Sequence, residues 1–179
     1  CRQAGANVTL VTGPSHEPLP PQVTILQVED AHEMHTAVMD DIEKMDIFIS
    51  TAAVADYKPK HFQGQKIKKS GQVLNLELEP TRDILREVAE QARVFTVGFA
   101  AETQNIRHYA LQKLLNKNLN MIAANDVSNG LAFDKNENAL LVLWRDGETH
   151  GEQILPAMPK ADLATQLVAL IAARLMANW

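Results

Sequence analysis

The sequence of 179 residues lacks the residue types on which several protein classes depend. Its one cysteine, Cys1, excludes an intrachain disulfide framework and a cysteine-rich zinc site. No apolar run approaches the roughly 18 residues of a membrane-spanning helix, so we expect no membrane span. The formal net charge of −5 argues against a general nucleic-acid binder, because such a protein neutralises phosphates with cationic residues.

Motifs of common enzyme classes are absent as well. The six histidines are scattered, with no HExxH motif and no Ser-His-Asp order, which argues against a histidine metal site and a hydrolase triad. We expect His32 and His35 to face solvent. No GxGxxG motif follows a predicted strand, which disfavours an NAD-dependent oxidoreductase.

What is present is an alternation of short buried strands and helices. We expect strands at 7–12, 23–28, 46–50, 72–79, 94–99, 119–123, 138–145 and 151–155. We expect helices at 31–45, 82–91, 105–116 and 160–178, with the last turn of a helix at 1–6. This order predicts an α/β fold with a Rossmann-like, mostly parallel sheet, helices on both faces and a β-hairpin or flap appendage.

Four loops that follow predicted strands carry the candidate ligand-binding residues. They span 50–58, 79–83, 98–103 and 124–129. In a doubly wound sheet such loops gather at one edge, where ligands bind. The topology therefore places four side chains near one crevice: Asp56, Phe99, Glu102 and Asn125. Asp56 could hold a ribose, a base or Mg²⁺, or be a plain turn residue, and Phe99 could lie against a base or pack in the core.

Lysines suggest a polyanionic ligand. The stretch 57–76 contains no acidic residue but five lysines, including Lys66 and Lys68, which alternation places on one face of an extended segment. A basic loop on an acidic body suits a nucleotide triphosphate, although a solvated loop explains the charges equally well. Lys113 and Lys117 share one helical face, where they either hold an anion or form a screened surface pair.

Four motifs, in this order and spacing, resemble phosphopantothenoylcysteine synthetase, the phosphopantothenate–cysteine ligase of coenzyme A biosynthesis. They are AAVADY (52–57), KIKK (66–69), VGFAAET (97–103) and ANDVS (124–128). The resemblance covers nearly the whole chain. In most bacteria this enzyme is fused to a flavin-dependent decarboxylase, so FMN is expected only in that other domain.

The resemblance implies a CTP-dependent ligase assisted by Mg²⁺. The carboxylate of 4′-phosphopantothenate attacks the α-phosphate of CTP and gives an acyl-cytidylate and pyrophosphate. The amine of cysteine then displaces CMP and forms an amide. Such a protein mainly positions reactants and neutralises charge. The resemblance also implies a cytoplasmic homodimer, associated with the decarboxylase domain and binding neither nucleic acid nor membrane.

The resemblance assigns the site residue by residue. Lys66 is expected to act on the phosphates, and Ala52 and Ala53 to approach the acyl intermediate. Lys113 and Lys117 are expected to hold the triphosphate. The remaining nucleotide contacts are expected from Ser50, Thr51, Ala52, Asp56, Glu79, Pro80, Thr81, Arg82 and Phe99. The resemblance identifies no metal ligands in the chain.

Two departures from the family pattern are visible. Thr81-Arg82-Asp83 stands where members read Asn-Pro-Asp or Thr-Pro-Asp, which affects the expected base contacts. The family's leading strand, loop and helix, with an asparagine essential for the second half-reaction, have no counterpart. We therefore expect residues 1–179 to be one ligase domain that lacks this segment. The alternative is a non-catalytic nucleotide-binding Rossmann module.

Overall fold

A mixed five-stranded sheet forms the centre of the molecule. The computed structural model describes residues 1–61, 63–69, 71, 73–91, 93–128 and 136–177. The strands are β3 (Ile47–Ser50), β6 (Phe95–Glu102), β7 (Met121–Asp126), β8 (Glu137–Asp146) and β9 (Thr149–Pro159), in this spatial order. The pairs β3–β6 and β6–β7 are parallel, whereas β7–β8 and β8–β9 are antiparallel.

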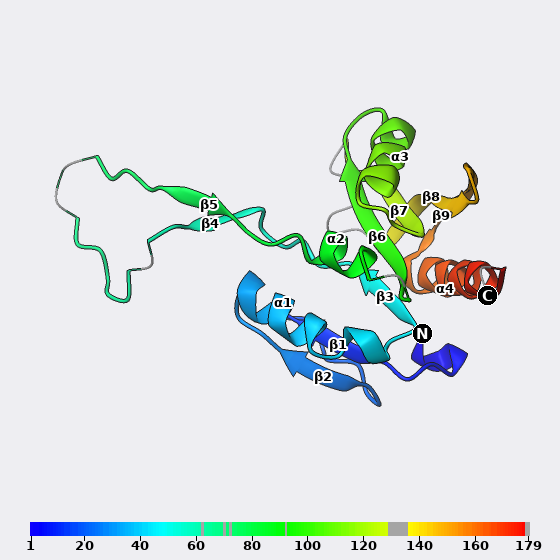
Figure 1. Ribbon diagram of the computed structural model, residues 1–179, viewed down its shortest axis with the longest axis horizontal. Coiled ribbons are helices and arrows are strands. Elements are labelled where there is room, and N and C mark those ends of the chain that lie inside the picture. Colours follow the sequence, from blue (N-terminus) through cyan, green and yellow to red (C-terminus); the bar gives the residue numbers. More distant parts are fainter. Residues whose placement is uncertain (62, 70, 72, 92, 129–135, 178–179) are drawn as a thin grey trace.

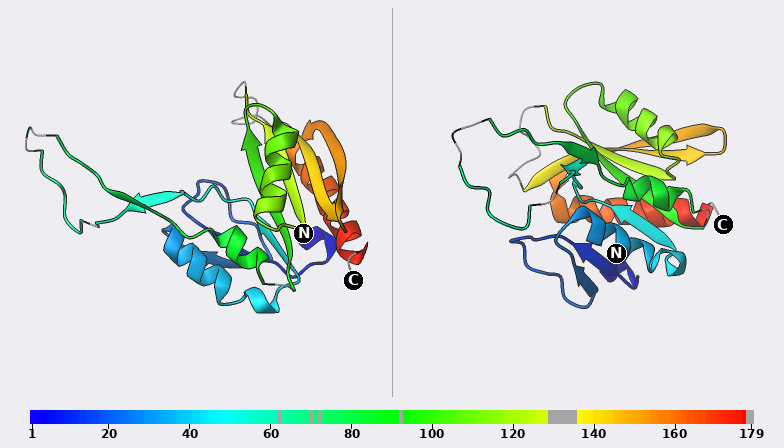
Figure 2. Two further views of the ribbon diagram at one scale, coloured as in Figure 1. Left: turned by 45° about the horizontal axis from the view of Figure 1, so that its top comes forward. Right: turned by 60° about the vertical axis from the view of Figure 1, so that its left-hand side comes forward.

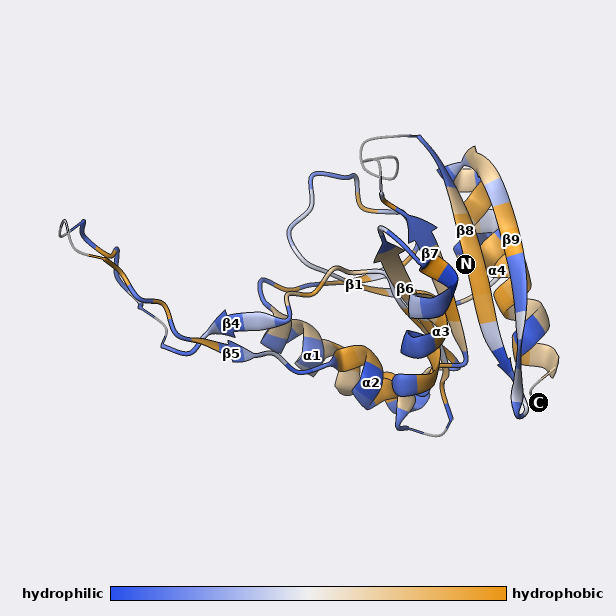
Figure 3. Ribbon diagram, turned by 90° about the horizontal axis from the view of Figure 1, so that it is seen from above, coloured by the Kyte–Doolittle hydropathy of each residue, from blue (hydrophilic) through white to orange (hydrophobic). Residues whose placement is uncertain are grey.

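Helices cover both faces of this sheet, as predicted (Figure 1). On one face, α4 (Lys160–Ala177) packs Leu163, Leu167 and Ile171 against residues of β6, β7 and β8. On the other face, α3 (Ile106–Asn116) packs Ala110 and Leu114 against Ile122, Leu143 and their neighbours. Colouring by hydropathy shows apolar residues where α4 meets β8 and β9 (Figure 3).

The first part of the chain forms a separate parallel pair. Strands β1 (Thr9–Thr12) and β2 (Thr24–Gln27) pair with each other, and helix α1 (Ala31–Met39) follows. A short 3₁₀ turn, η1 (Arg2–Ala4), ends at Gly5 with a φ of 88°, a left-handed conformation that glycine adopts without strain. Among the residues that the structure describes, β1 has no ladder to β3, although the sequence predicted one continuous sheet.

A long arm leaves the body between β3 and α2 (Ile84–Ala89). Its base is the antiparallel pair of β4 (Tyr57–Pro59) and β5 (Leu78–Pro80), and the segment between these strands extends away from the sheet (Figure 1). In both views of Figure 2 the arm stands clear of the helices. The arm corresponds to the predicted flap.

The hairpin of β8 and β9 differs from the prediction. It belongs to the main sheet, where β8 pairs with β7, and is not an appendage. The reason is its apolar face, because Leu140, Val142 and Trp144 join the core beneath α4. The sheet is therefore mixed rather than mostly parallel. The predicted turn is confirmed, since Gly147 between the two strands has a φ of 60°.

Several predicted elements are shorter in the structure. The helix expected at 31–45 ends at Met39 and is followed by a 3₁₀ turn, η2 (Ile42–Lys44). The strand expected at 72–79 is wrong in both length and burial: of its described residues only 78 and 79 belong to a strand, β5, and Val73 is 89% exposed. Its alternation predicted a buried apolar face, but Val73, Leu74 and Leu76 are all exposed in the part of the chain that the structure describes.

The expectation that His35 faces solvent is also wrong. Its side chain is buried between α1 and α2, and its Nε2 lies 2.7 Å from Oε2 of Glu87. This pair connects two helices that are far apart in the sequence. His32, by contrast, is exposed as expected. Over the residues that the structure describes, no helix is long and apolar enough to cross a membrane.

Candidate functional site

The carboxyl ends of β3, β6 and β7 lie side by side and carry most of the predicted site. Ser50, the last residue of β3, is in register with Gly98 of β6. Further along β6, Ala101 is in register with Asn125 of β7. Phe99 lies within β6 rather than at its end, and its side chain is 36% exposed, so the ring is available at the surface. The parallel register therefore brings three predicted loops to one edge.

The loop after β3 presents a small and open surface. Thr51, Ala52, Ala53, Ala55 and Asp56 are all exposed. Their short side chains allow a ligand to approach the backbone closely. Among the described residues, Asp56 forms no salt bridge, so its carboxylate is free for a ligand hydroxyl or a cation.

A second loop, 79–83, is tied directly to the first. The hydroxyl of Thr81 donates a hydrogen bond to the carbonyl oxygen of Ala55 at 2.6 Å. The amide of Thr81 donates to the carbonyl oxygen of Asp56 at 2.9 Å. Asp83 caps the beginning of α2, and its carboxylate accepts a hydrogen bond from the amide of Arg86 at 3.2 Å.

Lys113 of α3 and Lys117, which caps the carboxyl end of this helix, connect the remaining parts of this edge. Lys117 Nζ lies 2.8 Å from Oδ2 of Asp83, at the beginning of α2. Lys113 Nζ lies 2.6 Å from Oε1 of Glu102, at the end of β6. The loops at 50–56 and 79–83, the end of β6 and one face of α3 are thus joined into one continuous surface. We call this surface the loop cluster.

The loop after β7 is fixed next to Glu102. The amide of Val127 donates to the carbonyl oxygen of Glu102 at 2.9 Å. Ser128 bonds to the carboxylate of Asp126 through its side chain and its amide, and these bonds lower the pKa of Asp126 from its ordinary value. Asp126 is thus tied to the turn that follows β7, beside the cluster.

Lys66 is the predicted residue that the structure does not bring to the loop cluster. It lies in the arm between β4 and β5, which extends away from the sheet (Figure 1). Two lysines at the base of the arm differ from Lys66 in being paired: Lys58 and Lys60 lie 3.3 and 2.5 Å from carboxylate oxygens of Glu79 and Glu77. Lys66 and Lys68 form no salt bridge with any described residue, and Ile67 between them is exposed rather than packed.

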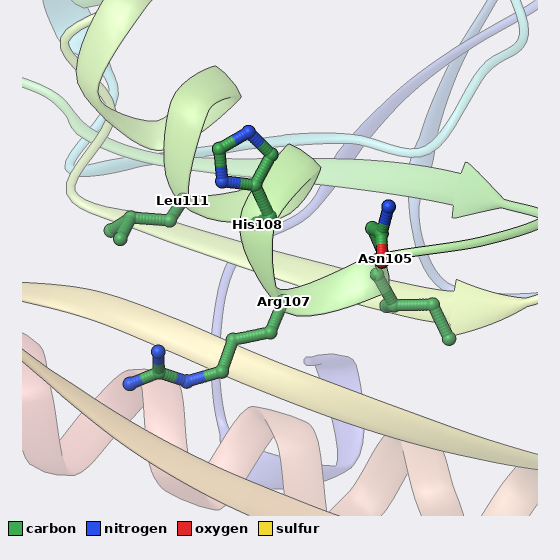
Figure 4. Close-up of a pocket in the computed structure, with 5 residues that line it drawn as sticks. Asn105, Arg107, His108 and Leu111 are labelled. Atoms are coloured by element: carbon green, nitrogen blue, oxygen red, sulfur yellow. The ribbon is translucent and has the colours of Figure 1, made fainter.

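A hollow beside the first turn of α3 is a weaker candidate. Its lining residues are Asn105, Ile106, Arg107, His108 and Leu111, which come from a single helix and its cap. Figure 4 shows that Arg107 and His108 point in different directions. Arg107 is held by Glu152 of β9 at 2.6 Å, so the polar groups of this hollow do not converge on a ligand.

Comparison with known proteins places this arrangement in a family. Residues 1–175 match the model of the DNA/pantothenate metabolism flavoprotein C-terminal domain. The chain belongs to this family. It is 47% identical over 174 residues to the coenzyme A biosynthesis bifunctional protein CoaBC of Vibrio cholerae, covering 94% of this chain and 43% of that protein. The corresponding protein of Bacillus subtilis is 41% identical, with 96% of this chain and 42% of that protein covered.

The fold agrees with a solved member of the flavoprotein C-terminal domain family. The crystal structure of the C-terminal domain of a CoaBC protein superposes with a TM-score of 0.78 at 36% identity, covering 99% of this chain and 78% of that one. A flavoprotein from Streptococcus pneumoniae, 18% identical with a TM-score of 0.73, shares the fold. The chain spans less than half the length of the curated relatives it matches.

The sequence analysis did not predict two features of the site. The carboxylates that bind Lys113 and Lys117 were not expected, because nothing in the sequence links 83 to 117 or 102 to 113 before the sheet is folded. The contact between Arg82 and His35, at 3.4 Å, was missed because His35 was placed on the surface. Arg82 is the position at which the resemblance leads us to expect a proline, so this contact lies at one of the two expected departures from the family pattern.

Proposed function

We propose that this chain acts as a phosphopantothenate–cysteine ligase domain in coenzyme A biosynthesis, with CTP as the activating nucleotide. The observation that carries the proposal is the loop cluster, in which two of the four motifs, AAVADY and VGFAAET, lie on one surface with Lys113 and Lys117. Family membership and the bifunctional relatives support the same activity. The proposed roles of the other site residues follow from this activity.

The loop cluster supplies complementary groups for a nucleotide. The exposed backbone at 51–53 and the side chain of Asp56 would contact the nucleotide, with Ser50 beside them. Phe99 offers a ring face for the base, and 79–82 borders it. Lys113 and Lys117 supply mobile positive charges of the kind that bind phosphates. Ala52 and Ala53 leave room for the acyl group next to the α-phosphate.

The chemistry needs positioning and charge neutralisation rather than a strong protein nucleophile. The carboxylate of phosphopantothenate attacks the α-phosphate, the bond to the β-phosphate breaks, and pyrophosphate leaves. The cysteine amine then attacks the acyl carbon, loses a proton and expels CMP. Lysine ammonium groups stabilise negative charge that develops on the phosphoryl oxygens. We propose that Lys66 has this role once the arm lies over the loop cluster.

Mg²⁺ is compatible with the residues at the site. Among the described residues, no group of three histidine, cysteine, aspartate or glutamate side chains converges on a metal position. Mg²⁺ commonly needs only one or two carboxylates together with substrate phosphates, and Asp56 could provide one of these. When bound, the ion neutralises phosphate charge.

The separate β1–β2 pair supports a further proposal about the domain. We propose that the central sheet is completed by a strand that precedes Cys1 and lies between β1 and β3. The chain covers 78% of the solved CoaBC domain, so that domain contains additional segments. We also propose that the domain works as a cytoplasmic homodimer. Its association with a decarboxylase domain is a further proposal, supported by the bifunctional relatives.

Two experiments test the proposed function. Calorimetric titration with CTP, ATP and NAD is expected to show binding of CTP in preference to the other two. An assay with phosphopantothenate, cysteine and CTP, on this domain extended upstream, is expected to release pyrophosphate. Lys66→Gln should abolish acyl-cytidylate formation, while Lys68→Gln serves as the neighbouring control. Normal turnover by the Lys66 variant would refute its role, and the absence of CTP binding would refute the proposed function.

A further inference from the structure

Both lysines of the proposed triphosphate site already have negatively charged partners. Lys113 pairs with Glu102 at 2.6 Å and Lys117 with Asp83 at 2.8 Å. The two carboxylates come from β6 and from the beginning of α2, so neither belongs to the helix that carries the lysines. The formal charge of these four groups is zero, and a polyphosphate therefore meets a neutral cluster rather than a positive pocket.

The two carboxylates cannot move far when a phosphate arrives. Glu102 has a side chain that is only 15% exposed, and its backbone is held by pairing with Asp126 and by the amide of Val127. Asp83 caps α2, so its carboxylate also binds the amide of Arg86. A phosphate that binds either lysine consequently lies near a fixed negative charge, which repels it.

We propose that Glu102 and Asp83 are internal counter-ions of the triphosphate site, which orient the two lysines and weaken the hold on pyrophosphate. The inference rests on the proposed function, since it concerns the same site. An ammonium group has three donors, so each lysine can share its bonds between a carboxylate and a phosphate. The carboxylate keeps the lysine in place before binding and opposes tight binding afterwards. Pyrophosphate, the leaving product, is then released readily.

The counter-ion role and a purely structural role predict different changes in anion affinity when a carboxylate is removed. If the pairs only anchor α3 to β6 and α2, removing a carboxylate leaves anion affinity unchanged or lowers it through local disorder. If the carboxylates act as counter-ions, their removal strengthens anion binding. Removing one negative charge a few ångströms from a partly exposed phosphate is expected to tighten binding roughly fivefold or more.

Calorimetric titration of this chain with sodium pyrophosphate and with CTP, with and without Mg²⁺, tests the proposal. Glu102→Gln keeps the shape of the side chain and is expected to bind pyrophosphate about fivefold more tightly. Asp83→Asn should act in the same direction, and asparagine remains a good helix cap. Glu152→Gln is the matched control, because Glu152 pairs with Arg107 of the same helix at 2.6 Å and lies outside the loop cluster.

The outcomes separate this inference from the proposed function. Three results together would support the counter-ion role. Glu102→Gln binds pyrophosphate more tightly, Glu152→Gln binds it unchanged, and the gain in affinity from Glu102→Gln disappears when Lys113→Met is also present. If the unaltered chain binds CTP, but Glu102→Gln and Asp83→Asn bind pyrophosphate equally or more weakly than it does, the counter-ion role alone is overturned. No binding of CTP by the unaltered chain would overturn the proposed function. Thermal unfolding of each variant verifies that it is folded.

Discussion

Gly98 of β6 allows helix α2, which begins next to the loop cluster, to pack closely against the central sheet. A Cβ atom at this position would lie 2.8 Å from Cδ1 of Leu119 and 3.0 Å from Cδ2 of Leu85. Carbon atoms pack best at about 3.5–4.0 Å, so Gly98→Ala is short of space by about 0.5 Å or more on both sides. Leu119 is completely buried and cannot retreat. Leu85, which is only partly buried, would have to shift its side chain, and α2 would be displaced as far as this side chain could not adjust.

The cost of this movement can be estimated from other overpacked cores. An added methyl group in a packed interior typically costs about 1–3 kcal/mol, and 1 kcal/mol lowers the Tm of a domain of this size by about 2–4 °C. We therefore expect Gly98→Ala to lower the Tm by about 2–12 °C, measured by circular dichroism or calorimetry. Because α2 begins at Asp83, which binds Lys117, nucleotide affinity should fall as well.

Gly13→Ala provides the matched control for this prediction. The nearest atom to a Cβ there is a carbonyl oxygen of Val28 at 3.9 Å, which is ordinary contact. This substitution should leave the Tm unchanged or raise it slightly, because alanine has less conformational freedom in the unfolded chain. If Gly98→Ala were as stable as Gly13→Ala, the close approach of α2 to the sheet would not exist as described.

Two further predictions concern other parts of the fold. A Cβ atom at Gly151 would collide with the buried indole of Trp144. Gly151→Ala should therefore lower the free energy of unfolding, measured by chemical denaturation, by about 2–4 kcal/mol, a cost comparable to losing a large buried side chain. An unchanged free energy of unfolding would contradict this packing. Asp30 accepts a hydrogen bond from the amide of Glu33, which lowers the pKa of Asp30 below its ordinary value of 3.8. The stabilising effect of the ionised Asp30 is thus complete above that pH and is lost as the pH falls below it. Asp30→Ala should therefore be less stable than wild type at neutral pH, and the difference in stability should shrink in acid. A difference in stability that does not change with pH would contradict the prediction.

The helices and buried strands could be predicted because their local patterns agree with their environment. The run at 94–99 is apolar except for Thr96 and forms the first part of β6, which is covered on both faces. The expected helix at 105–116 agrees with α3 to within one residue. In these segments propensity, periodicity and burial all favour the same structure.

The arm and the pairing of charges could not be predicted from local patterns. The alternation at 72–79 favours a half-buried strand, but burial depends on a partner surface that the sequence does not reveal. Whether Lys113 and Lys117 are free depends on Asp83 and Glu102, which only the packing of α2 and the sheet brings to them. His35 was misplaced for a similar reason, since its partner Glu87 lies on another helix.

The arm also divides the molecule into parts with different resistance to opening. Its base is a ladder of three residue pairs, strengthened by surface ion pairs that salt screens. The central strands, in contrast, have backbone hydrogen bonds enclosed by two apolar layers. Backbone amides in the arm should therefore exchange with solvent deuterium through local opening, whereas those of β6 and β7 should exchange only when the whole domain unfolds. The segment that carries Lys66 can thus rearrange without disturbing the sheet that holds the other site residues.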